Sequence, residues 1–279
     1  MKVCFDSCSM AINHTNDTKM FGVFYSNKNE VDFSIHVHEC CEIFLCLSGG
    51  KSFLIDDRIY EVSDGDLFVI NQFETHKITF EPGKVFSRCV LKVHPTFIYS
   101  CSTDKTDLSA CFYKRGPQIS NKISLSREDL MRLEGLLSQL RIENEYADDV
   151  IKNMITTRIL VLVNQLFAKN SQSKGMNYIE SNVVQKTIAY INNNFDGDLS
   201  LKTLAKNAFI SENQLCRLFK KELGITVSKY IASKRISQAK RLLKSGHSVS
   251  ATAIKCGYND YASFIRAFKK IVGVSPGKY

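Results

Sequence analysis

The last hundred residues carry polar and basic side chains of the types that read nucleic acid, at positions that repeat. Arg217 and Arg266 can each bind guanine through two hydrogen bonds, and Asn213 or Gln214, in the first helix only, can bind adenine in the same way. Lysines one helical turn later suit contacts with backbone phosphates. We predict double-stranded DNA as the partner, with phosphate contacts at Lys220, Lys221, Lys269 and Lys270 and base contacts at Asn213, Gln214, Cys216, Arg217, Tyr261, Ala262, Ile265 and Arg266.

The matched residues belong to an internal repeat. A single polar helix face is most often only solvated, but two matched faces favour a nucleic-acid surface. One structural unit therefore occurs twice. Upstream of a turn the spacing is 48 residues, so that Ser200, Leu201 and Ala205 recur as Ser248, Val249 and Ala253. Downstream the spacing is 49 residues, so that Leu215, Arg217, Phe219, Lys220, Lys221, Gly224 and Tyr230 recur as Phe264, Arg266, Phe268, Lys269, Lys270, Gly273 and Tyr279.

Each copy has the signals of a helix, a turn and a second helix. Serines at the predicted starts are good N-caps, and glycines at the predicted ends suit the left-handed C-terminal position. A connecting helix over 228–245 would span roughly 25 Å at ~1.5 Å per residue, which could hold the two second helices near one DNA turn apart, about 34 Å. The predicted N-caps are Ser200 and Ser211 in the first copy, with Gln214 as the capping-box partner of Ser211, and Asn259 or Asp260 in the second, and the predicted ends are Gly224 and Gly273.

Positive charge is concentrated in the same segment. The chain has 279 residues and a formal net charge of +9. Residues 183–279 hold 17 Lys or Arg and 5 Asp or Glu, a net charge of +12, so the remaining 182 residues carry −3. DNA suits so basic a segment. An acidic membrane would suit it too, but the segment has the periodicity of a folded core rather than of one basic amphipathic helix.

The chain does not have the pattern of a secreted or membrane protein. No stretch approaches the ~18 consecutive apolar residues of a membrane span, and polar residues interrupt the first 20 positions, where a signal peptide would be apolar. The ten cysteines include no Cys-x-x-Cys pair, so we interpret them as reduced thiols. A redox role for Cys40, Cys41 and Cys46 is the alternative. We therefore expect a cytoplasmic protein.

The first 170 residues change from strand signals to helix signals. Short apolar runs separated by turns over about 20–95 predict a sandwich or barrel. His36 and His38 fall on one face of an alternating segment over 33–38. Residues 95–125 are ambiguous, and from Ser126 two helices with wide apolar stripes could cover the barrel or pair with another subunit. The predicted domains are 1–125, a helical pair over 126–169, a polar linker over 170–182, and 183–279.

The C-terminal segment resembles the AraC/XylS family of bacterial transcription regulators. The resemblance covers about residues 185–279, through the stretches SENQLCRLFKKELGITVSKYI, KRISQAKRLL and CGYNDYASFIRAFKKIVGVSPGKY. It implies a DNA-binding domain in which two helix-turn-helix units are joined by a central helix. Two positions depart from the family pattern. Thr252 stands where Ile or Val is usual, and the sequence stops at Tyr279, before the Arg that commonly follows.

The segment over about 20–95 resembles a cupin barrel. The stretch HVHECCEIFLCLSG looks like the first cupin motif, and GDLFVINQFETH resembles the second, with Asn71 and Phe73 in place of its usual Pro and Gly. Many sensor domains of the family hold an organic molecule in this barrel. Imidazole and carboxylate also suit iron, manganese, zinc or nickel. The predicted effector-binding residues are His36, His38, Glu42 and His76, and the same four match the ligands of metal-binding cupins. The alternatives are that the barrel binds a metal ion, or that it binds neither a metal ion nor an organic molecule.

Together these features predict an α+β protein: a cupin-like β-barrel, a helical pair, and an all-α domain with two helix-turn-helix units joined by a long helix. The predicted function is a sequence-specific, effector-responsive transcription regulator that is not an enzyme and requires no cofactor. By resemblance and by its apolar stripes, the helical pair is the expected homodimer interface, and RNA polymerase is a partner if the protein activates. The alternatives are a metal-dependent cupin enzyme fused to a DNA-binding domain, and a regulator controlled by a protein partner. We expect the first unit, which is richer in polar base readers, to carry more of the sequence specificity.

Overall fold

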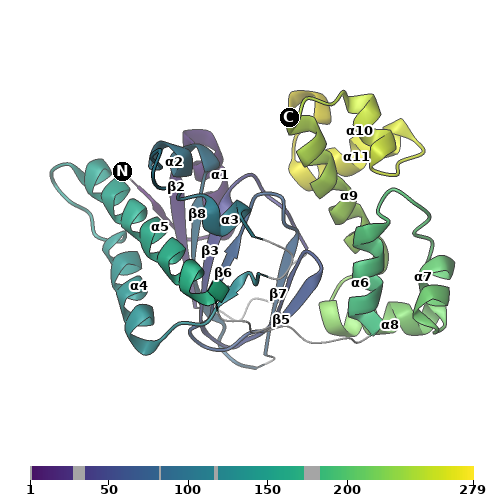
Figure 1. Ribbon diagram of the computed structural model, residues 1–279, viewed down its shortest axis with the longest axis horizontal. Coiled ribbons are helices and arrows are strands. Elements are labelled where there is room, and N and C mark those ends of the chain that lie inside the picture. The colour runs from purple at the N-terminus through teal and green to yellow at the C-terminus, as the bar shows by residue number, and fades with distance from the viewer. Residues whose placement is uncertain (1, 28–34, 82, 116–118, 173–182) are drawn as a thin grey trace.

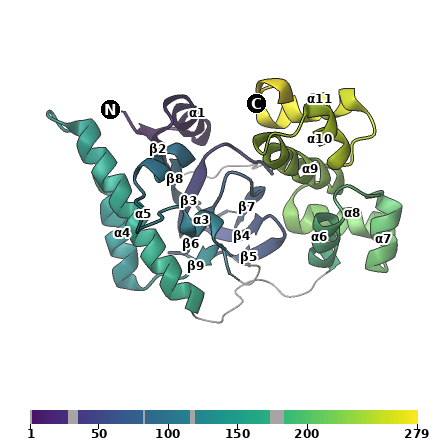
Figure 2. The same cartoon turned by 45° about the horizontal axis from the view of Figure 1, so that its top comes forward.

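The computed structural model describes residues 2–27, 35–81, 83–115, 119–172 and 183–279. It has a strand-rich N-terminal region (2–172) and an all-helical C-terminal region (183–279), which lie side by side in Figures 1 and 2. The strands are β1 (Cys4–Phe5), β2 (Phe21–Asn27), β3 (Cys41–Ser48), β4 (Gly50–Ile55), β5 (Arg58–Glu61), β6 (Leu67–Ile70), β7 (His76–Phe80), β8 (Ser87–Val93) and β9 (Lys122–Ile123). The helices of the N-terminal region are α1 (Cys8–Thr18), α2 (Pro95–Ser100), α3 (Ala110–Tyr113), α4 (Arg127–Gln139) and α5 (Asp148–Gln172).

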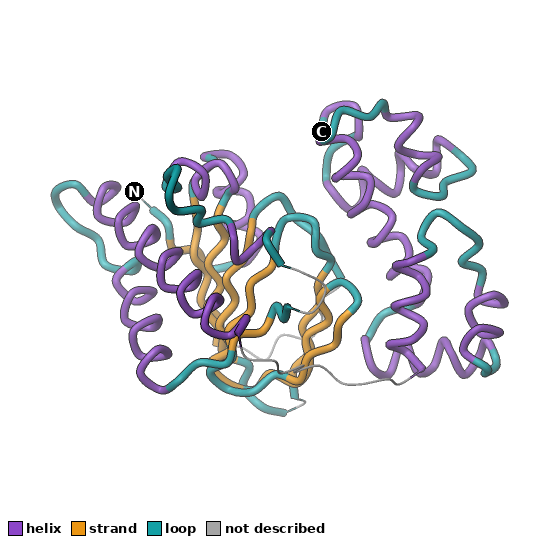
Figure 3. The backbone as a smooth tube through the Cα atoms, in the orientation of Figure 1, coloured by secondary structure: helices purple, strands orange, loops and turns teal. Residues whose placement is uncertain are grey.

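The described strands form two sheets, as Figure 3 shows, which confirms the expected sheet-rich, cupin-like domain, although the pairings among the described strands do not close into a single barrel. One sheet has the order β1-β2-β8-β3-β6-β9 and the other the order β5-β4-β7. The chain passes from the first to the second at Gly49, whose φ of +74° and close approach to the Val85 carbonyl leave no room for a side chain. Of the alternating segment 33–38, Phe33 and Ser34 lie outside the described residues, and in the described part His36 forms an isolated bridge to His76.

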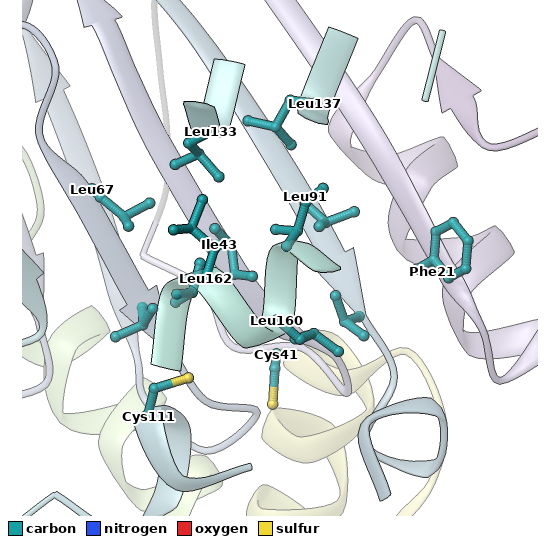
Figure 4. Close-up of a cluster of buried hydrophobic side chains, with 14 of the residues drawn as sticks. Phe21, Cys41, Ile43, Leu67, Leu91, Cys111, Leu133, Leu137, Leu160 and Leu162 are labelled. Carbon is teal, nitrogen blue, oxygen red and sulfur yellow. The ribbon is translucent and has the colours of Figure 1, made fainter. Parts of the chain in front are cut away.

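The helical pair covers the outer face of the six-stranded sheet. Figure 4 shows Leu133 and Leu137 of α4 and Leu160 of α5 packed over Ile43 and Leu91 of the sheet, and all five are buried. The predicted apolar stripes therefore bury most of their area within one chain. By length and composition alone the stretch Asp148–Asn170 of α5 could cross a membrane, but half of it is buried and a core helix passes the same test.

A second core lies between the two sheets and is aromatic. The rings of Phe44 and Phe53 are 4.9 Å apart, and Phe68 packs on Phe53 at 5.0 Å, both edge to face. These pairs combine large buried area with favourable ring geometry. Next to them the interior is hollow, because the second core does not fill the space as far as α1.

The C-terminal region confirms the two predicted helix-turn-helix units. Its helices are α6 (Val183–Asn193), α7 (Leu201–Ala208), α8 (Glu212–Leu223), α9 (Val227–Lys244), α10 (Val249–Lys255) and α11 (Tyr261–Val272), with a short 3-10 turn η1 (Pro276–Lys278). Ser200, Ser211 and Asp260 cap their helices as predicted, and Gln214 completes the capping box. Gly224 and Gly273 end α8 and α11 with left-handed backbone, and α9 matches the predicted connecting helix within a residue.

The two turns differ at one matched position. Phe209 in the first unit has φ +56° and is 93% exposed, whereas its equivalent 48 residues later is Gly257, with φ +74°. A non-glycine residue in this conformation costs about 1 kcal/mol, and the exposed ring makes little contact to offset that cost. Phe209 therefore strains the first unit.

We predict that Phe209→Gly raises the free energy of unfolding by about 0.5–1 kcal/mol, since glycine removes the strain but adds chain entropy to the unfolded state. Urea denaturation followed by circular dichroism measures the change. Phe209→Ala is the matched control, because it removes the ring and keeps the strain, so its stability stays close to that of the wild type. Equal stabilisation by both variants would show that the ring, and not the backbone, is responsible.

Candidate functional site

The predicted base-reading residues lie on the outer faces of α8 and α11. Seven of the eight are exposed, and Ile265 is half-buried because it also packs against the core of the second unit. Buried aromatics on the opposite face, Phe219 in α8 and Phe264 and Phe268 in α11, fix these orientations. The exposed residues are Asn213, Gln214, Cys216 and Arg217 on α8, and Tyr261, Ala262 and Arg266 on α11.

The two arginines differ in their surroundings. Arg217 is exposed on the middle of α8, whereas Arg266 donates to Ser263 Oγ at 2.8 Å and lies 3.6 Å from the Asp260 carboxylate. The N-cap of α11 thus orients Arg266 along the helix. The predicted phosphate-contacting lysines, Lys220, Lys221, Lys269 and Lys270, are all exposed near the ends of the same helices.

The core of the second unit contains an unsatisfied polar atom at Thr252, the position that departs from the family pattern. Thr252 is fully buried, and its hydroxyl has no hydrogen-bond partner among the described residues. An unsatisfied buried hydroxyl costs roughly 1–3 kcal/mol. The unpaired hydroxyl therefore lowers the stability of the core of the second unit.

The hollow between the sheets is a cavity of about 540 Å³. Apolar side chains from the sheets line one part of it, and α1 and the segment before β3 line another part, which we call its mouth. Two residues from the end of α11, Ile271 and Val272, also line it, so the cavity touches the C-terminal region directly. No sequence pattern predicts α1 or its place in the cavity wall, since Cys8–Thr18 has little amphipathic pattern.

All four predicted effector-binding residues converge in this cavity. The side-chain nitrogens of His36, His38 and His76 lie within 4.8 Å of one another. Glu42 Oε2 lies 2.9 Å from His38 Nε2 and 3.3 Å from His76 Nε2. The bridge between the backbones of His36 and His76 brings the two cupin-like motifs together, since each donates an N–H to the carbonyl of the other.

A lysine that is not among the predicted site residues lies between His38 and Glu42 of the cluster. Lys92 Nζ lies 2.9 Å from His38 Nε2 and donates to Glu42 Oε2, and the side chain is fully buried. The signal was present in the alternation of β8: Arg88, Val90 and Lys92 face the cavity, while Cys89, Leu91 and Val93 join the outer core. An inward lysine in an apolar strand is rare without a partner.

The charges of this cluster support one another. Burial and the neighbouring Lys92 ammonium hold the pKa of His38 well below its usual range, so His38 is neutral. Burial alone would raise the pKa of Glu42, but the neighbouring Lys92 ammonium holds it well below its usual range. Burial alone would lower the pKa of Lys92, yet the nearby Cys8 thiol and the Glu42 carboxylate hold it above its usual value. The site therefore contains one buried carboxylate–ammonium pair.

These residues fit a metal ion by type but not by arrangement. Three imidazoles and a carboxylate are common metal ligands. However, the Lys92 ammonium is within hydrogen-bond distance of two of the four ligand atoms. A divalent cation bound there would face a positive charge at close range. With Lys92 in place, the residues do not suit a metal.

The C-terminal region contacts the mouth of the cavity through a polar cluster that we call the Glu39 junction. Its members are Glu39, Lys240, Lys244 and Tyr279. Lys240, on α9, is fully buried, with its Nζ 2.8 Å from Glu39 Oε1 and 2.9 Å from the carbonyl oxygens of His38 and Gln72. Lys244 lies 2.9 Å from Glu39 Oε2, to which the Tyr279 hydroxyl also donates at 2.8 Å.

The charges of the Glu39 junction are set by burial and pairing. Burial alone would raise the pKa of Glu39, but Lys240 and Lys244 hold it below its usual value. Burial lowers the pKa of Lys240, and Glu39 opposes that shift. Because Glu39 directly follows His38, the segment that forms the cavity mouth is the same segment that contacts α9.

The same face of α9 makes further contacts with the N-terminal region. The Tyr230 hydroxyl donates to the Asp56 carbonyl at 2.6 Å, Lys234 lies 3.3 Å from the Asp56 carboxylate, and Ser237 donates to the Phe73 carbonyl. Spacings of three and four residues place these side chains on one stripe. The apolar residues Ile35, Leu54 and Ile59 of the N-terminal region join the core of the first helix-turn-helix unit in the same area.

Comparison with known proteins supports both halves of this description. Family models match residues 22–148, as an AraC-like ligand binding domain, and residues 204–279, as a helix-turn-helix domain. The chain is 26% identical to the HTH-type transcriptional activator RhaR of Cronobacter sakazakii, over 88% of this chain and 85% of that protein. It is 26% identical to the probable transcriptional regulator LumQ of Photobacterium leiognathi, over 88% and 90% of the two chains. ToxT from Vibrio cholerae O395 is a structural neighbour with 17% identity, a TM-score of 0.38, and coverage of 94% and 97%.

Proposed function

This chain belongs to the AraC family of DNA-binding transcription regulators, and we propose that a small organic molecule in its cavity controls how it binds DNA. The observation that carries the proposal is the position of the cavity. Its wall includes His38 of the N-terminal region and Ile271 of α11, so a ligand touches both regions at once. A ligand changes an equilibrium only if it contacts the two states differently. A site at the border between regions meets that condition.

The route from cavity to DNA-binding helices is short. A ligand that displaces His38 moves Glu39, and Glu39 holds Lys240 and Lys244 of α9. Since α9 joins the two helix-turn-helix units, its position sets how α8 and α11 are presented to DNA. This proposal therefore places the effector at His36, His38, Glu42 and His76 and assigns the Glu39 junction to coupling.

A ligand screen tests this proposal. Thermal shift with sugars, short carboxylic acids and aromatic acids should find compounds that raise the melting temperature, and the hits should change affinity for the upstream DNA of the neighbouring operon in fluorescence anisotropy. Ile12→Trp fills the cavity from its α1 wall and should abolish the response while leaving DNA binding intact. If no compound shifts the protein and a second protein co-purifies with it, regulation by a protein partner is the better explanation.

We predict that Arg217→Ala and Arg266→Ala each weaken binding to the specific site by ~1–3 kcal/mol and relax specificity at one base pair, because each removes a bidentate contact with guanine. Lys220→Ala should weaken binding to all sequences and reduce the salt dependence by about one phosphate contact. Anisotropy at several salt concentrations separates the two effects.

Arg127→Ala removes an exposed charge at the start of α4 and serves as the matched control. If it weakened binding as much as Arg217→Ala, net charge alone would account for the loss. We further propose that the first unit carries more of the specificity. Operators mutated in each half would contradict this if the half bound by the second unit were the more sensitive.

We also propose a cytoplasmic homodimer that activates transcription through RNA polymerase, in line with the RhaR relatives, which are named transcriptional activators. The exposed residues Met131 and Val161 flank a groove between α4 and α5 and are candidates for the dimer contact. The proposed domains remain 1–125, 126–169, 170–182 and 183–279, with α5 extending to Gln172. Val161→Asp should convert a dimer to monomers in sedimentation equilibrium; a wild type that is monomeric at all concentrations would exclude the dimer.

A further inference from the structure

Three hydrogen-bond acceptors converge at the centre of the cavity. His38 Nδ1 lies 2.9 Å from the Cys40 carbonyl and His76 Nδ1 lies 3.0 Å from the Glu74 carbonyl. A carbonyl can only accept, so a neutral ring at either position carries its proton on Nδ1 and presents a lone pair at Nε2. Both Nε2 atoms lie within 3.3 Å of Glu42 Oε2, which is also an acceptor. Such a group needs a positive charge or a strong donor at its centre.

Metal-binding cupins meet this need with a metal ion, and here Lys92 supplies the charge. Its ammonium offers three N–H donors. One reaches His38 Nε2 at 2.9 Å and another reaches Glu42 Oε2. His76 Nε2 is buried and has no hydrogen-bond partner among the described residues. In the neutral ring, with its proton on Nδ1, it is an acceptor 3.3 Å from Glu42 Oε2.

We propose that Lys92 is the resident cation of this cavity, that it takes the place of a metal ion, and that it leaves His76 Nε2 to accept a hydroxyl or amine hydrogen of the effector. The Lys92 ammonium balances the Glu42 carboxylate without an added ion. Lys92 is thus a specificity-determining residue: it excludes divalent metals and selects an organic ligand with a hydrogen-bond donor. The inference rests on the proposed function only in treating the cavity as the effector site.

Cobalt(II) is the probe that tests this inference, because His-ligated Co²⁺ has a visible d–d absorption. The full-length wild type, dialysed against chelator and titrated with Co²⁺, should bind no stoichiometric ion in the cavity. Lys92→Met removes the ammonium and keeps the volume, and we expect it to bind one Co²⁺ per chain at least ~100-fold more tightly than the wild type. Lys92→Arg keeps the charge and should remain metal-free, and His76→Ala in the Lys92→Met background should lose the ion.

Two results would overturn the inference. One is a wild type that binds one Co²⁺ per chain with the spectrum of bound imidazole, and the other is a folded Lys92→Met variant that binds none. If Lys92→Met does not fold, Lys92→Gln and the wild-type titration carry the same test. The proposed function fails separately. A wild type that binds no metal and responds to no organic compound would contradict the effector proposal and support the role of Lys92. A wild type that binds metal and still responds to an organic compound would contradict the role of Lys92 and support the effector proposal.

Discussion

Replacing Glu39 by glutamine is expected to weaken the contact between α9 and the N-terminal region by about 3 kcal/mol, since it leaves the ammonium of a buried lysine without its counter-charge. Lys240 is fully buried, and among the described residues it keeps the carbonyl oxygens of His38 and Gln72 as acceptors once the carboxylate is gone. Lys244 and Tyr279 lose the same partner. The glutamine fits the space, so the change acts through charge.

Two measurements should register this loss. In calorimetry, the C-terminal region should unfold at a lower temperature and separately from the N-terminal region. In solution scattering, the variant should have a larger radius of gyration than the wild type. Any compound found to change DNA affinity of the wild type should change that of Glu39→Gln much less, because the coupling passes through this carboxylate.

Glu145→Gln provides the matched control, as it removes an exposed carboxylate from the connection between α4 and α5. That connection and α9 lie on opposite sides of the molecule in Figure 1. An exposed charge of this kind contributes within about 0.5 kcal/mol. Identical calorimetry for the two variants would mean that the Glu39 junction does not hold the regions together, and the coupling route proposed above would then have to be abandoned.

The second large effect is expected at Glu42, inside the cavity. Glu42→Gln leaves the fully buried Lys92 ammonium without its carboxylate, and we predict a loss of about 3–5 kcal/mol in the free energy of unfolding of the N-terminal region. Breaking one partner of a buried pair is costly because the remaining charge stays desolvated. Guanidinium denaturation followed by tyrosine fluorescence measures the loss.

A double variant separates the charge from the shape of the site. In Glu42→Gln with Lys92→Met both charges are removed, so most of the lost stability should return, since a buried ion pair is often replaceable by neutral groups. Glu61→Gln, at an exposed position of β5, is the single-site control. A double variant no more stable than Glu42→Gln would show that hydrogen-bond geometry, rather than charge balance, holds this part of the fold.

Local signals in the sequence were sufficient to predict the helices of the C-terminal region and their exposed faces. Helix caps interact with residues at most four positions away, so they can be predicted without a structure. This holds for the N-caps Ser200, Ser211 and Asp260 and for the glycines that end α8 and α11. The repeat then placed Arg217 and Arg266 on equivalent faces. The unfavourable Thr252 could also be recognised from the sequence, because it replaces the Ile or Val of the family pattern that the rest of the segment follows.

The fold class of the N-terminal region could be predicted from the sequence, but whether its strands close into a barrel could not. Turn residues and alternation revealed the strands, and the cupin-like motifs identified four side chains that do converge. Whether strands close into a barrel depends on pairings between distant segments, which alternation does not specify. For the same reason the apolar stripes of α4 and α5 could be recognised, but not the face on which they pack.

The sequence by itself determined what kind of protein this is: a basic, twice-repeated helix-turn-helix segment joined to a cupin-like domain with a cluster of histidines. Only the tertiary structure decided what surrounds that cluster. Lys92 reaches Glu42 across 50 residues of chain, and Lys240 reaches the His38 carbonyl across 202. The sequence around each lysine does not predict its partner, because a buried charge is stabilised by groups that come together only when the chain has folded.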